Sequence, residues 1–275
     1  MKDIIQRSLQ EDIGRGDITT KSLVPKGTMA KAKIIAKEDG IVAGIAFAKE
    51  VYRHVDPSLK FMSFCKESCK VKKGYVIATV SGSAASIITG ERVVLNFLQS
   101  MSGIATYTSK FVEKIKGTKA VILDTRKTMP GTRIMSKIAV ENGGGSNHRM
   151  GLYDAILIKD NHIAIVGDIK KAVEKTKKFG FVEVEAKSLD QVKQSLEAGA
   201  DRILLDNMNI PMMKKAVKAI RSWRKKKVQI EASGGVNLKT VRNIAKTGVD
   251  FISVGALTHS ADALDISLDI VEIII

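Results

Sequence analysis

The chain has 275 residues, of which 44% are hydrophobic and 27% are charged. This length suits one α/β barrel or two domains, and the composition is that of a globular enzyme with a large core. Charges interrupt every apolar tract well short of the roughly 20 residues that a membrane helix requires, and the first ten residues lack the apolar core of a signal peptide. We therefore expect no membrane association and a cytoplasmic location.

The formal net charge of +16 raises the question of nucleic-acid binding. The lysines are concentrated in residues 170–178 and 214–227, at spacings typical of exposed helix faces. Aromatic residues make up only 5% of the chain, so few rings are available to stack on bases. We interpret the excess as a solvated helix surface and predict no nucleic-acid partner. Cys65 and Cys69 have no neighbour at metal-ligand spacing, so reduced thiols are expected.

The first part of the chain predicts a small sheet with helices. Apolar residues at helical spacing predict a helix over residues 1–13. Short apolar or alternating runs follow, and they fit strands with one helix near residues 46–54. These runs cover residues 29–36, 40–43, 59–64 and 75–80. Residues 84–116 then predict a long helix, broken near residues 102–103, in which spacing alone makes Arg92 a surface charge.

From residue 119 onward, apolar runs alternate with helical patterns in a unit of about two dozen residues. The runs are 121–124, 155–159, 181–186, 202–207, 228–233 and 251–255. Strands that alternate with helices predict parallel pairing, and the regular unit favours a barrel over an open sheet. A doubly wound sheet that binds a nucleotide is expected to have a glycine-rich turn after its first strand, and residues 125–128 contain no glycine. Among the last twelve residues, apolar and polar positions alternate as far as Ile270. This pattern indicates a strand that joins the amino-terminal sheet, with a carboxy-terminal barrel element as the alternative.

Cationic residues gather at the ends of the early strands and in the loop between them. They are Arg126, Lys127, His148, Arg149 and Lys159. Because α/β barrels place their chemistry at the carboxy ends of the strands, these groups are expected to converge. Together they imply an anion with more than one negative group, and the arginines suit carboxylates because they bind them in a bidentate manner.

Carboxylates end the middle strands, and glycine turns follow the late ones. Glu185 and Asp206 are expected to share a magnesium ion, which typically takes one or two carboxylates plus phosphate oxygens. The late turns would offer backbone amides to a phosphate. They contain Ser233, Gly234, Gly235, Gly255 and Ala256. Singly, Asp206 could be a helix cap, Glu185 a rim charge and the serine-glycine turn a plain tight turn. Their occurrence at successive strand ends favours a site for phosphoribosyl transfer to a carboxylated small molecule.

With these groups in order, the chain resembles the quinolinate phosphoribosyltransferase family. The segments that carry the resemblance are EDIGRGDITT, GERVVLNFLQSMSGIAT, DTRKTMPGTR, GGGSNHRMGLYDAILIKDNHI, VEVEA, LLDN, EASGGV and SVGALTHS. The resemblance implies an amino-terminal α/β sandwich over 1–105, joined by 264–275, and an incomplete α/β barrel of six or seven strands over 106–263. It also implies conversion of quinolinate and phosphoribosyl pyrophosphate to nicotinate mononucleotide, pyrophosphate and CO₂ in NAD biosynthesis.

The resemblance assigns roles to individual residues. Arg126, His148, Arg149 and Lys159 would contact the quinolinate carboxylates, with Lys127 close by at the reacting centre. Glu185 and Asp206 would hold Mg²⁺ and the ribose hydroxyls, and the late glycine turns would line the phosphate site. No organic cofactor is implied. Arg92 would reach the barrel of a partner subunit, so a homodimer is expected, with any higher oligomer left open.

Two other enzyme classes are open alternatives. A lysine at a strand end of a barrel could form a Schiff base, so Lys159 could belong to an aldolase. A ModD-like paralogue, of the kind associated with molybdate transport, would share the fold and is difficult to separate by motifs alone.

Overall fold

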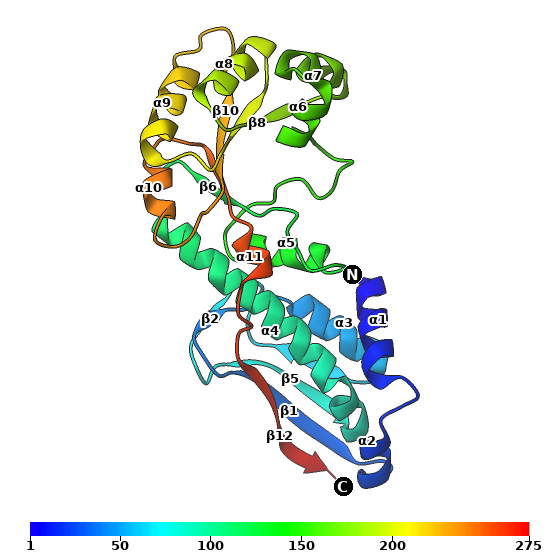
Figure 1. Cartoon of the computed structure of the whole chain (residues 1–275). Helices are drawn as coiled ribbons and strands as arrows, with labels where there is room; N and C mark the ends of the chain where they lie inside the picture. Colours follow the sequence, from blue (N-terminus) through cyan, green and yellow to red (C-terminus); the bar gives the residue numbers. More distant parts are fainter. Residues whose placement is uncertain (275) are drawn as a thin grey trace. The chain divides into compact units, whose positions relative to one another are not determined.

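The computed structural model describes residues 1–274, and the chain divides into two compact units (Figure 1). The first unit comprises Met1–Ser109, Thr128–Gly144 and Ser260–Ile275, and the second comprises Lys110–Lys127 and Gly145–His259. Within residues 1–274, no helix has both the length and the apolar character needed to cross a membrane.

The first unit is built on an antiparallel sheet with the strand order β12-β1-β5-β3. Its strands are β1 (Met29–Ala36), β3 (Lys60–Ser63), β5 (Val76–Ser83) and β12 (Ile266–Ile274). Alternate residues of β1 are buried, so one face of the sheet packs on the core. The carboxy-terminal segment pairs with β1 as the alternating pattern led us to expect, with Ala36 opposite Ile266. A small ribbon pairs β2 (Gly40–Ile41) with β4 (Lys70–Val71).

Five helices accompany this sheet: α1 (Lys2–Ile13), α2 (Ile18–Leu23), α3 (Ile45–Val55), α4 (Ala84–Lys114) and α5 (Arg133–Asn142). In Figure 1, α3 and α4 lie across the sheet. Their contact includes the rings of Phe47 and Phe97, whose centroids are 5.3 Å apart. The core of this unit therefore lies between the sheet and the helices that cover it.

Helix α4 is continuous, and the break predicted near residues 102–103 is wrong. Gly103 serves a close approach instead, because a Cβ there would lie 2.1 Å from the carbonyl oxygen of Asp262. The hydroxyl of Ser102 is buried and accepts the amide of Ala43 at 3.0 Å. Ser102 and Gly103 therefore do not end the helix. They pack it against the segments that contain Ala43 and Asp262.

The second unit is an incomplete α/β barrel built on a six-stranded parallel sheet with the order β6-β11-β10-β9-β8-β7. The strands are β6 (Val121–Leu123), β7 (Ile156–Ile158), β8 (Val182–Ala186), β9 (Arg202–Asp206), β10 (Gln229–Ser233) and β11 (Phe251–Ser253). Each corresponds to one predicted run, with ends shifted by up to two residues. Beyond the edge of β6, Ser146 forms a parallel bridge with Leu123, so the loop after α5 extends the sheet.

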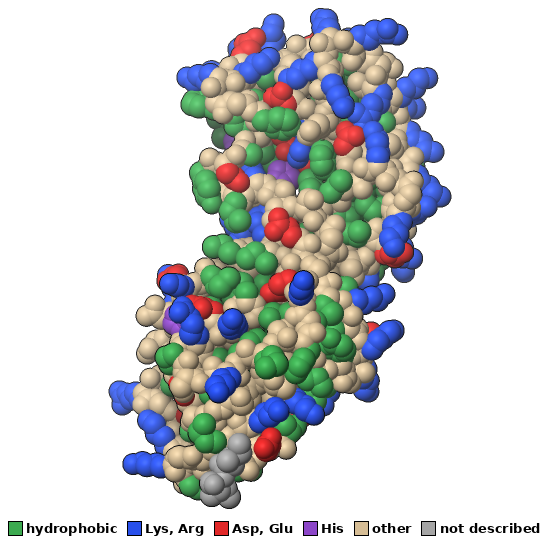
Figure 2. Space-filling view, turned by 180° about the vertical axis from the view of Figure 1, so that it is seen from behind, with side chains coloured by type: hydrophobic (Ala, Val, Ile, Leu, Met, Phe, Trp, Pro, Cys, Tyr) green, Lys and Arg blue, Asp and Glu red, His purple; other side chains and the backbone are tan. Residues whose placement is uncertain are grey.

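Short helices follow the strands of this sheet along the chain. They are α6 (Asp160–Val166), α7 (Ile169–Thr176), the 3₁₀ turn η1 (Lys177–Phe179), α8 (Leu189–Ala198), α9 (Ile210–Arg221), α10 (Val241–Ala245) and α11 (Ala256–His259). Side-chain caps begin three of them, since Asp168, Ser188 and Asn209 each accept an amide three residues later. On α7 and α9 the lysines are exposed while apolar residues face inward. Figure 2 shows Lys and Arg side chains spread over the visible face rather than gathered into one patch.

Candidate active site

A cavity of about 660 Å³ opens in the second unit at the carboxy ends of the parallel strands. Its volume falls within the range of roughly 300–1,000 Å³ that is usual for small-molecule sites. Every predicted site residue except Arg92 lines it. Arg92 lies exposed on α4 in the first unit. The structure thus brings together the cations, the carboxylates and the glycine turns that the sequence placed at separate strand ends.

Buried Asp124 organises the cationic wall of the cavity. It follows β6, and its Oδ1 accepts the amide of His148 at 2.8 Å. The backbone of Ser146 makes two hydrogen bonds with the β6 segment, at 2.8 and 3.2 Å. These bonds hold the loop that carries His148 and Arg149 beside the strand end that carries Arg126 and Lys127. The loop is therefore fixed next to the strand, as the sequence suggested.

Arg149 faces the cavity from this loop with its guanidinium half-buried. Its Nη1 donates to the carbonyl oxygen of Ala155 at 2.9 Å. Burial and the nearby charge of Arg126 both lower the pKa of Arg149 from its ordinary value. Two guanidinium groups that repel each other in a partly desolvated wall are stabilised by an anion between them. Lys159, at the end of β7, adds a third cation to the lining.

Glu185 and Asp206 form the acidic part of the cavity, at the ends of β8 and β9. Burial and the neighbouring Asp206 raise the pKa of Glu185. Nζ of Lys187 lies 3.9 Å from Glu185 Oε1 but 2.6 Å from Asp160 Oδ2, so this lysine pairs mainly with Asp160. Two mutually repelling carboxylates on adjacent strands fit Mg²⁺, which accepts one or two carboxylates together with phosphate oxygens.

Asn207 fixes the position of Asp206. Its backbone adopts the left-handed conformation, with φ 53°, and its Nδ2 donates to Asp206 Oδ2 at 3.0 Å. The opposite face of this amide packs on Gly234, where a Cβ would lie 2.2 Å from Asn207 Oδ1. Gly234 also has a positive φ of 92°. Glycine is needed there both for the positive φ and for the close packing, and only the turn was predicted from the sequence.

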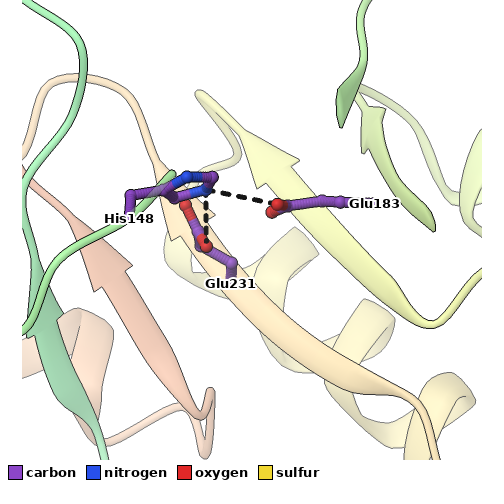
Figure 3. Close-up of side chains that lie close together, drawn as sticks. All are labelled: His148, Glu183 and Glu231. Atoms are coloured by element: carbon purple, nitrogen blue, oxygen red, sulfur yellow. Dashed lines mark ion pairs between the residues drawn. The ribbon is translucent and has the colours of Figure 1, made fainter. Parts of the chain in front are cut away.

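His148 and Glu231 line the inner part of the cavity and form a charged cluster with buried Glu183 (Figure 3), and neither glutamate was predicted from the sequence. Nε2 of His148 lies 3.2 Å from Glu183 Oε2 and 3.5 Å from Glu231 Oε2. Nη1 of Arg202 lies 3.1 Å from the same Glu231 oxygen and 3.8 Å from Glu183 Oε2. The strand period could have revealed the two glutamates. Each stands two residues before a predicted site residue on its strand, so both members of each pair share a face.

The ring of His148 has a protein partner at each nitrogen. Burial alone would lower the pKa of His148, but the hydrogen bonds with Glu183 and Glu231 outweigh it and raise that pKa to about 9. Nδ1 accepts the backbone amide of Arg149 at 2.7 Å, which requires an Nδ1 without a proton. The neutral ring that this bond requires carries its proton on Nε2, toward the carboxylates. Below its pKa of about 9 the ring gains a second proton on Nδ1, which strengthens the charge contact with the carboxylates and leaves Nδ1 unable to accept the amide.

The pKa values of Glu183 and Glu231 are shifted in opposite directions. Burial and the charge of Glu231 raise the pKa of Glu183. Burial would raise the pKa of Glu231, but His148, Ser253 and Arg202 outweigh burial and lower that pKa. Three potential metal ligands thus lie within 4.8 Å of one another here. We assign no metal to them, because the Arg202 guanidinium already occupies the charge-compensating position that a cation would take.

Profiles of two domain families match the chain. Residues 17–102 match the quinolinate phosphoribosyl transferase N-terminal domain, and residues 104–269 match the quinolinate phosphoribosyl transferase C-terminal domain. The chain belongs to the quinolinate phosphoribosyltransferase family. The candidate site lies entirely within the part that matches the C-terminal domain of this family.

Named relatives cover nearly the whole chain. A quinolinate phosphoribosyltransferase [decarboxylating] from Nicotiana glauca is 45% identical over 293 residues, spanning 98% of this chain and 82% of the relative. A probable nicotinate-nucleotide pyrophosphorylase [carboxylating] from Bacillus subtilis is 41% identical and spans 98% and 93%. The solved nicotinate-nucleotide pyrophosphorylase from Francisella tularensis superposes with a TM-score of 0.91 at 42% identity, covering 98% of this chain and 95% of that one. The quinolinate phosphoribosyltransferase fold is therefore shared over both units.

Proposed function

We propose that this chain transfers the phosphoribosyl group of phosphoribosyl pyrophosphate to quinolinate, with release of pyrophosphate and CO₂. The product is nicotinate mononucleotide, a precursor in NAD biosynthesis. The observation that carries the proposal is one cavity with a cationic wall and an acidic pair facing it. The named relatives at 41% and 45% identity support the same reaction.

The cationic wall suits the dianion of quinolinate. Arg126, Arg149 and Lys159 would hold its two carboxylates. One charge pair at 4 Å contributes about 4 kcal/mol at an effective dielectric near 20, before desolvation. Several such pairs bind a dicarboxylate far more strongly than a monocarboxylate, so nicotinate would be a poor substrate. The His148 ring lines the same wall, although its nitrogens already have protein partners.

The acidic pair suits the phosphorylated sugar. Glu185 and Asp206 would hold Mg²⁺ and the ribose hydroxyls, and the ion would neutralise the diphosphate when bound. The amides of the turns at Gly234 and Gly255 would bind phosphate oxygens. Asn207 holds Asp206 from the side through the bond described above.

The chemistry requires no organic cofactor. The pyridine nitrogen displaces pyrophosphate at ribose C1 through an oxocarbenium-like state, and Lys127 lies near this reacting centre. The alkylated ring nitrogen carries a positive charge. When the 2-carboxylate leaves as CO₂, that charge stabilises the electron pair left on the ring carbon, which then takes a proton. The cationic wall must hold the carboxylates without quenching the nitrogen nucleophile.

We also propose a homodimer in which Arg92 completes the partner's site. Arg92 is exposed on α4 and does not line the cavity of its own chain. Mixing two inactive variants, Arg92→Ala and Arg149→Ala, tests this arrangement. Random reassociation into two-fold dimers would restore about a quarter of the active sites. No regained activity in a mixture that exchanges subunits would contradict a shared site. A cytoplasmic location and any assembly beyond a dimer stay predictions.

Turnover with two matched pyridines tests the proposed function. Purified protein with phosphoribosyl pyrophosphate and Mg²⁺ is expected to form nicotinate mononucleotide from quinolinate and to do so poorly from nicotinate. Equal rates with both would contradict the role of the cationic wall. Absence of turnover with quinolinate would favour the ModD-like alternative, which shares the fold. Borohydride trapping of a carbonyl substrate on Lys159 would instead indicate the aldolase alternative.

A further inference from the structure

The interior of this barrel is charged at a level where parallel barrels usually pack Val, Ile and Leu. Glu183 is 3% exposed and Glu231 is 0% exposed, and both side chains point toward His148 (Figure 3); Glu231 also lines the inner part of the cavity. Moving a carboxylate out of water costs several kcal/mol even after relaxation. Such a pair calls for an explanation other than core packing.

Arg202 anchors the pair from the far end of the barrel. Its Nε and Nη2 donate to Gln229 Oε1 at 3.0 and 2.8 Å. Its guanidinium lies 4.3 Å from the centre of the Phe251 ring. Because Gln229 and Phe251 hold Arg202, it fixes the Glu231 carboxylate, which its Nη1 contacts at 3.1 Å.

The carboxylates in turn fix His148, and His148 fixes Arg149. The Nε2 side of the ring faces Glu183 and Glu231, while Nδ1 lies 2.7 Å from the backbone nitrogen of Arg149. The amide of His148 itself is bound to Asp124. Arg149 is thus held at its backbone by the ring and at its guanidinium by the Ala155 carbonyl. A continuous line of contacts runs from Arg202 to the cationic wall.

From this line of contacts, we propose that Glu183 and Glu231 are positioning residues for the dicarboxylate substrate, acting through His148 on Arg149. The inference rests on the proposed function, because it takes the bound dicarboxylate to be quinolinate. Although Glu231 lines the cavity, in this account both glutamates act through His148 rather than by contact with the substrate. They set the place of the arginine that contacts the substrate.

A purely stabilising role explains the arrangement less well. Among residues 1–274, Glu183 Oε1 and Glu231 Oε1 accept no hydrogen bond. A buried acceptor without a partner is unfavourable for folding. A cluster selected for stability alone would satisfy those oxygens or replace the charges by apolar side chains. Glu231 Oε2 instead serves His148 and Arg202 together.

Substitution of Glu231 separates positioning from charge. Glu231→Leu removes the acceptor for the His148 ring, whereas Glu231→Gln retains an acceptor and removes only the charge. Both remove a negative charge from behind an anion site, so charge alone predicts tighter quinolinate binding for both. Positioning predicts that the KM for quinolinate rises in both, by about tenfold or more in Glu231→Leu and less in Glu231→Gln, because small displacements in a site have large kinetic effects.

Two controls distinguish a general loss of folded structure from a displacement of Arg149. The KM for phosphoribosyl pyrophosphate should stay within about twofold in both variants, since its binding groups lie elsewhere in the cavity. Glu174→Gln, at an exposed glutamate on α7, removes the same charge from the surface and serves as the matched control. A parallel rise of both KM values, or a similar rise in the control, would overturn the inference.

A double-mutant cycle with Arg149 tests the route. If Glu231 acts through Arg149, the effect of Glu231→Leu on quinolinate KM should largely vanish in an Arg149→Lys background. Additive effects would overturn the route through Arg149. Unchanged or tighter quinolinate binding by Glu231→Leu, with an active wild type, would overturn the inference and leave the proposed function intact. A wild type that does not turn over quinolinate would overturn both.

Discussion

Gly234→Ala perturbs the phosphate side of the site at a defined atom. The new Cβ would lie 2.2 Å from Asn207 Oδ1, so the Asn207 amide must move. That movement endangers its hydrogen bond to Asp206 Oδ2, now 3.0 Å long. A hydrogen bond to a charged group contributes roughly 1.5–3 kcal/mol, which corresponds to about 10- to 100-fold in kcat/KM. We expect this loss for phosphoribosyl pyrophosphate, with quinolinate affinity little changed.

Gly235→Ala is the matched control for this prediction. Gly235 also has a positive φ, 61°, but a Cβ there would meet no atom within 4 Å. It therefore introduces backbone strain of order 1 kcal/mol without the collision. Initial rates over a grid of both substrate concentrations give the two KM values. Equal damage by both substitutions, or a loss confined to quinolinate, would refute the reasoning that Asn207 positions Asp206.

Substitutions of Arg149, Glu185 and Asp250 test other parts of the structure. Arg149→Ala should lower kcat/KM for quinolinate by about 100-fold or more while calorimetric binding of phosphoribosyl pyrophosphate survives; equal loss of both ligands would count against the division of the cavity. Glu185→Gln should raise the Mg²⁺ concentration needed for half-maximal turnover, and an unchanged Mg²⁺ dependence would exclude Glu185 as a ligand. Burial would raise the pKa of Asp250, but hydrogen bonds from Arg221, Lys119 and the Ile230 amide lower it below 3.8. Its stabilising effect is therefore present above that pH and is lost as the pH falls through the lowered value, so Asp250→Asn should flatten the loss of thermal stability in acid.

The strand ends could be read from the sequence because barrel chemistry follows the period of the chain. Arg126, Lys159, Glu185 and Asp206 each lie at the end of an apolar run or just beyond it, and the parallel sheet brings such positions to one rim. The rule for strand ends did not predict the polar residues that lie earlier in the same strands. Glu183 lies inside the run VEVEA. Alternation predicts that it shares a face of the strand with Glu185, but it does not predict that the polar site continues along that face as far as Glu183.

Close packing lay beyond what the sequence could reveal. Gly103 looked like a helix end, and the structure uses it for the approach of Asp262. The tie between Gly234 and Asn207 joins turns after two different strands, so neither turn alone indicates it. Such features depend on which segments meet, and local patterns carry no such information.

The fate of the 2-carboxylate tests the central claim most directly. Quinolinate labelled separately at the 2- and 3-carboxyl carbons is incubated with the protein, phosphoribosyl pyrophosphate and Mg²⁺, and released CO₂ and pyrophosphate are counted together. The account predicts one labelled CO₂ per pyrophosphate from the 2-position, none from the 3-position, and none without phosphoribosyl pyrophosphate. Pyrophosphate release without CO₂, or CO₂ release without the sugar, would contradict a cavity built to alkylate the ring nitrogen before decarboxylation.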